Sequence, residues 1–291
     1  MKTKNKIILF GKRLIYDKKK KVCIYYMDLE KKWKFYTNEK GFLLLLNCFY
    51  YVKKILKKYK KKYDINIKNG KEIYSKKSNL KKTGITWTEE EYNNDSMRYI
   101  YIIVKSFQRF TEMWSLLESF DSYYTRKENN VLSLGSGPGF ESLAYKIFYK
   151  NDEKIKMYGI DSIKKWKSAF ENFGSFYDID VLKEEKKFFE FLKKTKINII
   201  ILSNVYANYM TNEKGTLFIR KLFFLYNIKF VLINDRSKDL SKFISKFKKY
   251  GIYTYFLINK KDHRQIFLTL LSNLNSNGTK KKTFANVPYL K

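Results

Sequence analysis

The stretch VLSLGSGPGFES (131–142) holds an unusual share of the glycine and proline in this chain. Only two prolines and twelve glycines occur in 291 residues, yet Pro138, Gly135, Gly137 and Gly139 all fall in this one turn. Glycine allows a tight turn and lets a ligand approach the backbone closely. This clustering indicates that the backbone is constrained here.

The sequence on either side of the turn predicts a strand that enters it and a helix that leaves it. VLSLG (131–135) is a short apolar run, and FESLAYKIFY (140–149) has apolar residues at helical spacing. A glycine-rich loop over a helix N-terminus is typical of a nucleotide-type site at the carboxyl edge of a sheet. We therefore expect a ligand at this turn.

After this turn, strand and helix patterns alternate along the chain. Short β-branched runs are typical of buried parallel strands, so the alternation predicts an α/β fold with a Rossmann-like, seven-stranded, mostly parallel sheet covered by helices on both faces. The last two runs leave no room for a helix between them and predict an antiparallel hairpin at the C-terminal edge. The expected strands are 131–135, 156–161, 174–181, 197–205, 229–235, 252–258 and 265–271, and the expected helices are 140–149, 163–172, 184–194, 213–225 and 239–250.

The spacing of the glycines narrows the kind of ligand. The dinucleotide fingerprint is G-x-G-x-x-G, whereas the third glycine here comes one position early, and the G-x-x-x-x-G-K-[ST] signature of a P-loop is missing. Asp161 stands 22 residues after Gly139 at the end of the second expected strand, where an acid accepts hydrogen bonds from ribose hydroxyls. Asp180 ends the third expected strand, where an acid could reach an adenine amino group.

Together these features resemble the class I S-adenosylmethionine-dependent methyltransferases. The resemblance covers roughly residues 95–272 and rests on VLSLGSGPGFES, on YGIDS around Asp161, on FYDIDVL around Asp180, and on INIIILSNVYANY (197–209) as the strand with the fourth motif. It implies S-adenosyl-L-methionine as the cofactor and a sheet that ends in an antiparallel edge hairpin.

The resemblance also implies which residues hold the cofactor. The glycine-rich loop would line its amino-acid end, Asp161 would hold the ribose, and Asp180 would face the adenine, with Asp178 as the competing choice. No metal is expected, because one histidine and two cysteines cannot form a Cys/His zinc cluster. The implied cofactor set is Gly135, Ser136, Gly137, Pro138, Gly139, Asp161, Asp180 and Ser203.

The catalytic residues are harder to assign. Ser203 and Asn204 would border the methyl group, and Asn204 and Tyr206 are the candidate catalytic residues. Residues 203–206 lack the D/N-P-P-Y/F/W element of adenine amino methylation and the aspartate of the Lys-Asp-Lys-Glu set of ribose 2′-O-methyltransferases. Both cysteines lie in the N-terminal region, which disfavours a cysteine nucleophile for cytosine C5 methylation. Positioning a nucleophile in line with a sulfonium makes a dedicated base optional.

The charge of the chain points to a polyanionic partner. The formal net charge is +33, which favours RNA or DNA through sequence-independent attraction. Lysine outnumbers arginine 54 to 7, which is typical of AT-rich codon usage and accounts for part of the excess. The run Lys53–Lys62 is either a solvated helix face or a nucleic-acid contact.

The region before the expected sheet predicts a small basic N-terminal domain of mixed structure over 1–85. It contains β-rich runs in 5–37 with a hairpin loop at 17–21, a helix over 41–63, and a polar loop or linker over 64–84. A methyltransferase-like domain over 86–272 would begin with a capping box at Thr88 and Glu91, followed by one or two amphipathic helices over 97–120. A flexible polar tail over 273–291 would follow.

These observations predict an S-adenosylmethionine-dependent methyltransferase that acts on RNA. The alternatives are a protein or small-molecule methyltransferase, and a non-catalytic methyltransferase-like subunit that binds RNA or a partner enzyme. Two cysteines fit a reducing compartment, and the longest apolar stretch, FLLLLNCFYYV (42–52), is too short to span a bilayer, so we expect a cytoplasmic protein without a membrane partner.

Overall fold

The computed structural model divides the chain into two compact units, one up to Thr111 and one from Glu112, so that the division falls within helix α5 (Asp95–Phe120). The domain limits expected from the sequence stay a prediction. The described residues are 4–9, 12–17, 22–26, 33–36, 39–76, 87–124, 129–150, 152–205, 213–235, 247–260 and 263–274.

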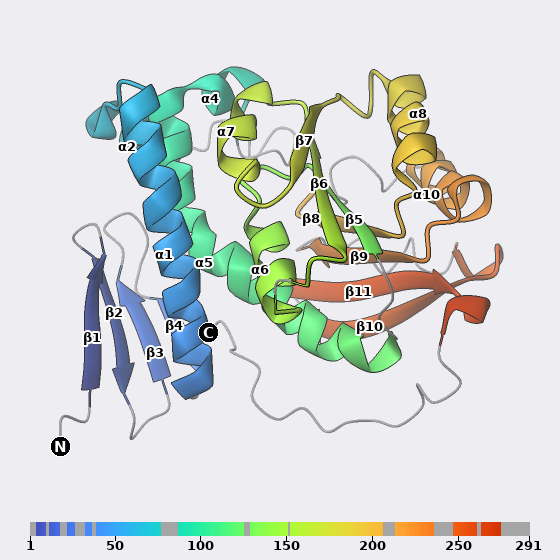
Figure 1. Ribbon diagram of the computed structural model, residues 1–291, viewed down its shortest axis with the longest axis horizontal. Helices are drawn as coiled ribbons and strands as arrows, with labels where there is room; N and C mark the ends of the chain where they lie inside the picture. The colour runs from blue at the N-terminus through green and yellow to red at the C-terminus, as the bar shows by residue number, and fades with distance from the viewer. Residues whose placement is uncertain are drawn as a thin grey trace. The chain divides into compact units, whose positions relative to one another are not determined.

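The first unit begins with a four-stranded antiparallel sheet in the order β1-β2-β3-β4 (Figure 1). Strands β2 and β3 pair antiparallel across the stretch after Asp17, which confirms the expected hairpin. The strands are β1 (Lys4–Leu9), β2 (Lys12–Asp17), β3 (Val22–Tyr26) and β4 (Trp33–Tyr36).

The first unit continues with the helices α1 (Glu39–Lys62), α2 (Ile67–Lys76), α4 (Glu89–Asn93) and the start of α5. The expectation of a helix over 41–63 is confirmed. The expected capping box is also confirmed, because the Thr88 hydroxyl accepts a hydrogen bond from the Glu91 N–H and the Glu91 carboxylate accepts one from the Thr88 N–H. A single helix covers the region 97–120.

The expectation of a loop or linker over 64–84 was wrong for Ile67–Lys76, which form α2, and residues 77–84 lie outside the described residues. The α2 sequence, rich in Lys and Asn and containing Gly70, gives a weak helical pattern. Tertiary contacts decide the structure instead: the Trp87 indole donates to the Tyr74 carbonyl (3.2 Å), and a Cβ on Gly70 would lie 2.4 Å from the Ser96 carbonyl oxygen. The glycine therefore permits α2 to approach α5 closely, a packing reason that sequence propensity does not reveal.

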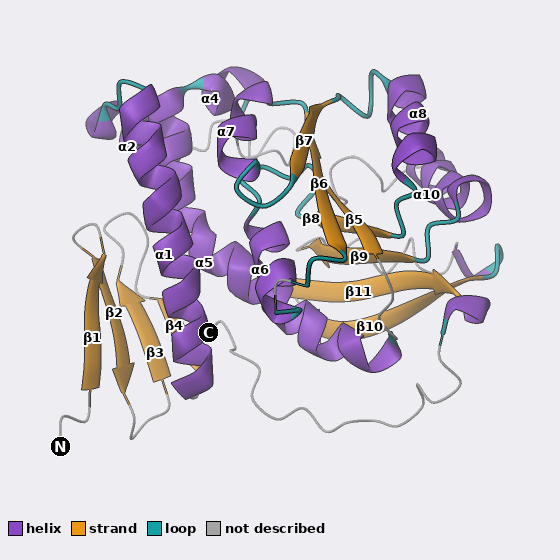
Figure 2. Cartoon of the chain, viewed as in Figure 1, coloured by secondary structure: helices purple, strands orange, loops and turns teal. Residues whose placement is uncertain are grey.

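The second unit contains a seven-stranded sheet in the order β10-β11-β9-β8-β5-β6-β7 (Figures 1 and 2). Strands β5 to β9 are parallel, whereas β11 pairs antiparallel with both β9 and β10. Numbered from β5, this order is 3-2-1-4-5-7-6, so the expected Rossmann-like, seven-stranded, mostly parallel sheet with an antiparallel C-terminal edge is confirmed. The strands are β5 (Asn129–Leu134), β6 (Ile155–Asp161), β7 (Ser175–Asp178), β8 (Ile199–Ser203), β9 (Phe230–Asp235), β10 (Ile252–Lys260) and β11 (His263–Leu270).

Helices follow most strands of this sheet, as predicted. The α-helices are α6 (Phe140–Phe148), α7 (Lys167–Phe170), α8 (Glu185–Thr195) and α10 (Glu213–Tyr226), and the 3₁₀ turns are η1 (Asp121–Tyr123), η2 (Lys164–Trp166) and η3 (Leu271–Asn273). The helix expected over 163–172 is divided between η2 and α7. The one expected over 239–250 lies outside the described residues except for its last few positions.

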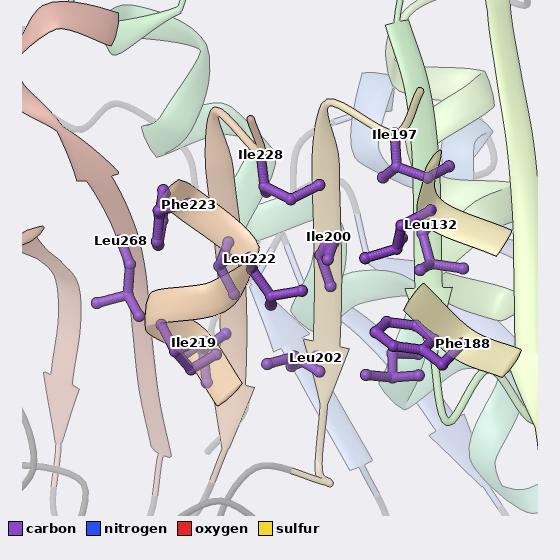
Figure 3. Packing of buried hydrophobic residues seen from close by; sticks show 14 of the residues in the cluster. Leu132, Phe188, Ile197, Ile200, Leu202, Ile219, Leu222, Phe223, Ile228 and Leu268 are labelled. Carbon is purple, nitrogen blue, oxygen red and sulfur yellow. The ribbon is translucent and has the colours of Figure 1, made fainter. Parts of the chain in front are cut away.

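A buried hydrophobic cluster packs against one face of the sheet. Side chains of α8 and α10 point toward those of the strands between them, as Phe188, Ile219 and Leu222 do in Figure 3. Alternate strand residues such as Ile200 and Leu202 face this cluster and are completely buried. Near-complete burial of the central strands β5, β8 and β9 explains why they read as mostly apolar runs.

The longest helices of the described chain are α1 and α5, with 24 and 26 residues. Neither they nor any other described helix combines the length and apolar character needed to cross a membrane. Lysines occupy the second half of α1, and buried polar residues such as Ser106 and Glu112 interrupt α5.

Candidate cofactor site

The glycine-rich loop joins β5 to α6 and is held against the end of β6. The Ile160 carbonyl oxygen accepts hydrogen bonds from the Gly135 N–H (2.9 Å) and the Ser136 N–H (3.0 Å). The Ser136 carbonyl oxygen in turn accepts one from the Gly139 N–H (3.0 Å). These bonds fix the loop at the carboxyl edge of the parallel strands, where ligands bind in open α/β sheets.

All three loop glycines have left-handed backbones, with φ of 65° at Gly135, 49° at Gly137 and 86° at Gly139. At two of them any side chain would also clash: a Cβ on Gly135 would lie 2.5 Å from Val205, and a Cβ on Gly139 would lie 2.8 Å from Phe173. A Cβ on Gly137 would meet no atom of the described residues within 4 Å. The middle glycine therefore borders open space, and the outer two are required by packing.

The Asp161 carboxylate ties the end of β6 to this open glycine. One carboxylate oxygen accepts from the Gly137 N–H (2.8 Å), and the other accepts from the Ile163 N–H (2.9 Å). Burial raises the pKa of the Asp161 carboxyl from 3.8 to about 6, against the lowering effect of these two hydrogen bonds, and the Asp178 carboxylate adds a smaller increase. Each carboxylate oxygen has a second lone pair, so Asp161 can still accept hydrogen bonds from two hydroxyls of a ligand.

The start of α6 adds groups that can receive an anion. Gly139 caps the helix without a side-chain hydrogen bond, and the N-terminal turn of a helix attracts negative charge. The buried hydroxyls of Ser136 and Ser142 have no hydrogen-bond partner among the described residues. The start of α6 thus adds a positive helix terminus and two buried hydroxyls, whereas the N–H groups of Gly135, Ser136, Gly137 and Gly139 are already bonded within the protein.

These residues fit the cofactor expected from the sequence. The open face at Gly137 leaves room for a ligand against the backbone, and the Ser136 hydroxyl and the α6 terminus suit the carboxylate of its amino-acid end. Asp161 suits a ribose with two hydroxyl donors. Pro138 lies between Gly137 and Gly139, and its ring restricts the backbone φ angle there.

The adenine-side acids differ from the expected arrangement in one respect. The third strand, β7, ends at Asp178 rather than at residue 181, because the chain turns at Asp180. There the Asp180 carboxylate accepts from the Leu182 N–H (3.1 Å) and pairs with Lys183 (3.3 Å). In the sheet register Asp178 stands beside Asp161. The role of Asp180 stays a prediction, and the strand register favours the competing Asp178.

The fourth strand ends in a polar network that reaches from β8 across β9. The Asn234 amide donates to the Ser203 hydroxyl (3.3 Å), and the Asn234 carbonyl accepts from the Asn204 N–H (2.7 Å). The Asn204 side chain donates to the Ser203 hydroxyl (3.1 Å), and its backbone is left-handed with φ of 57°. Ser203 and Asn204 thus stand together at the end of β8, and their position beside the methyl group stays a prediction; Tyr206 lies outside the described residues.

Three buried residues complete this network and were not identified from the sequence. The Asn234 amide donates to the Glu112 carboxylate (3.1 Å), and the Gln265 amide donates to the Glu112 carbonyl oxygen (2.5 Å) and to the Asn234 side chain (3.2 Å). Glu112 is only 3% exposed. A lone acid in the apolar run FTEMWSLL was the available signal for it, but only the fold brings residues 112, 234 and 265 together.

Among the described residues, no cluster of three or more His, Cys, Asp or Glu side chains could hold a metal ion.

Comparisons with known proteins give similar folds at low identity. No protein-family model matches the sequence, and no curated protein sequence matches it. Among solved structures, the plantazolicin methyltransferase BpumL in complex with SAH matches with a TM-score of 0.46 and 11% identity, covering 70% of this chain and 98% of that one.

Two further solved structures illustrate the range of these matches. The precorrin-6y C5,15-methyltransferase of Geobacter metallireducens has a TM-score of 0.39 and 7% identity, covering 53% of this chain and 86% of that one. TrmK of M. capricolum in complex with S-adenosyl-homocysteine has a TM-score of 0.37 and 13% identity, covering 55% and 68%. The fold is assigned from the strand order and the loop geometry above and not from these matches.

Proposed function

We propose that this protein is an S-adenosylmethionine-dependent methyltransferase whose acceptor is RNA. One observation supports S-adenosylmethionine as the cofactor: Gly137 borders open space, and its N–H donates a hydrogen bond to the Asp161 carboxylate. A loop of this shape, at the carboxyl edge of a sheet with this strand order, supports the binding of a nucleoside with an attached anionic group.

Each group of the site has a role in this proposal. The Ser136 hydroxyl and the N-terminus of α6 would hold the amino-acid end of the cofactor, Asp161 would accept from the ribose hydroxyls, and Asp178 or Asp180 would accept from the adenine amino group. When bound, S-adenosylmethionine supplies a sulfonium methyl group, which an acceptor displaces while the sulfur keeps the bonding electron pair.

The end of β8 would orient the acceptor. Ser203 and Asn204 are partly exposed and can make hydrogen bonds, but neither side chain removes a proton at neutral pH. The network through Asn234 to Glu112 holds both in place. Alignment of the nucleophile with the methyl group would then supply much of the rate effect, with Tyr206 as the further candidate.

RNA is the proposed acceptor because of charge. A net charge of +33 attracts a polyanion and gives salt-dependent binding whatever its sequence. A protein or small-molecule acceptor is the second candidate. The lack of an ionisable side chain at residues 203–205 supports a third, a non-catalytic subunit that binds the cofactor and RNA.

One experiment separates these functions. The protein is incubated with methyl-labelled S-adenosylmethionine and total RNA, and the RNA is digested to nucleosides to locate the label. Label in a nucleoside supports the proposal. Label in protein alone refutes the RNA acceptor, and no transfer together with intact cofactor binding by calorimetry leaves the non-catalytic subunit. If the protein does not bind the cofactor, both methyltransferase proposals are refuted.

A further inference from the structure

The second half of α1 carries a dense surface of lysine side chains. Seven of the ten residues from Lys53 to Lys62 are lysines, and all seven are exposed. No acidic residue occurs between Glu39 at the start of the helix and Asp64 after its end. This is unlike α8 of the second unit, where Glu185 and Glu190 alternate with lysines.

The spacing of these lysines arranges them in two adjacent rows along one side of the helix. Residues four apart stand one above the other at intervals of about 6 Å. Like charges at this spacing repel one another and destabilise an isolated helix, and a bound polyanion would relieve that repulsion. The rows are Lys53, Lys57 and Lys61, and Lys54, Lys58 and Lys62.

An exposed aromatic ring extends the same surface. Tyr50 is 62% exposed and precedes Lys53 and Lys54 by three and four residues, so it lies one turn before the two rows. Single-stranded nucleic acids bind where cationic side chains follow the backbone and exposed aromatic rings stack on bases. Tyr50 and the lysine rows provide both features on one helix.

The opposite side of α1 argues against a membrane surface as the partner. Val52, Ile55, Leu56 and Tyr59 are all 3% exposed or less, so the apolar side of the helix is buried in the protein. An interfacial helix needs a free apolar face to enter a bilayer. The exposed part of the second half of α1 is instead its charged side, with Tyr50 one turn before it.

We propose that this face of α1, formed by Tyr50 and the two lysine rows, binds single-stranded RNA. The lysines contact phosphates and the Tyr50 ring stacks on a base. The inference extends the proposed function, since this RNA would include the methyl acceptor, but binding to α1 is measurable without methyl transfer.

The test uses the full chain and a labelled single-stranded RNA of about 20 nucleotides, longer than the usual site sizes for such proteins. Binding is followed by fluorescence anisotropy at about 50 and 200 mM salt. One variant replaces Lys53, Lys54, Lys57 and Lys61 with Gln. A matched control removes four charges from exposed positions of the second unit: Lys156, Lys186, Lys193 and Lys194.

We expect the α1 variant to bind RNA at least tenfold more weakly at low salt. The slope of the logarithm of its binding constant against the logarithm of salt concentration should become shallower by about 3, because each of the four lost phosphate contacts contributes about 0.7. In the control variant, both the RNA affinity and the slope of the salt dependence should change much less. Tyr50→Ala should weaken binding about tenfold, whereas Tyr50→Phe keeps the ring and should bind like the parent protein. Equal losses in the α1 and control variants would overturn the proposal, because affinity would then follow net charge alone.

Two further arms separate this inference from other partners and from the proposed function. Tighter binding to anionic phospholipid vesicles or to duplex RNA than to single strands would refute it. Each variant is also titrated with S-adenosylhomocysteine. Loss of RNA binding with intact cofactor binding supports the α1 surface, and absence of cofactor binding in every variant refutes the proposed enzyme while the RNA result still decides the surface.

Discussion

Acidification should weaken cofactor binding through Asp161. Hydrogen bonds from ribose hydroxyls require the carboxylate form, and burial raises the pKa of this group to about 6. At pH 5 about ten molecules in eleven carry the proton, so the affinity should be about tenfold lower than its limit at high pH and should fall about tenfold for each further unit.

Isothermal titration calorimetry with S-adenosylhomocysteine at pH 5, 6, 7 and 8 measures this dependence. The α-carboxyl and α-amino groups of the ligand titrate largely outside the range from pH 5 to 7, so they do not imitate the effect. Asp161→Asn should bind weakly at every pH and lose the dependence. Asp178→Asn should move the midpoint to lower pH, because the Asp178 charge contributes to the raised pKa.

The Asp161 carboxyl should also make the stability of the ligand-free protein depend on pH. Its folded-state pKa lies above the usual 3.8, so its protonated form favours the folded state. The free energy of unfolding should therefore fall as the pH rises from about 4 to about 6, by about 3 kcal/mol at most. Equal affinity at pH 5 and pH 7 would refute the assignment of Asp161 to the ribose.

Three further changes test other parts of the structure. Gly137→Arg should abolish cofactor binding by calorimetry while the protein keeps its circular dichroism spectrum, because the side chain would enter the open space; unchanged binding would remove this loop from the site. Glu112→Ala should lower the free energy of unfolding by about 1–3 kcal/mol in urea denaturation, because the buried Asn234 amide loses an acceptor, and Glu112→Gln should cost less; equal effects would contradict the hydrogen-bond explanation. Thr88→Ala should cost about 1 kcal/mol in the same assay through loss of the helix cap, with Thr88→Ser as the control that keeps it.

The sequence by itself determined the second unit in outline. Each buried strand is a continuous apolar run, and each glycine of the loop stands where only a left-handed backbone closes the turn, so local pattern and final structure agree. The antiparallel edge was also predictable, because the segment between the last two strands is too short for a crossover helix. Asp161 was identifiable because it is an acid at the end of an apolar strand.

Only the tertiary structure decided which groups meet. Glu112, Asn234 and Gln265 are far apart in the chain, and α5, β9 and β11 bring them into one hydrogen-bond network with Ser203. Helix α2 forms against its weak propensity because Gly70 lets it lie close to α5. Among the loop glycines, the fold alone distinguished the two that packing requires from Gly137, because the difference depends on side chains brought from other parts of the chain.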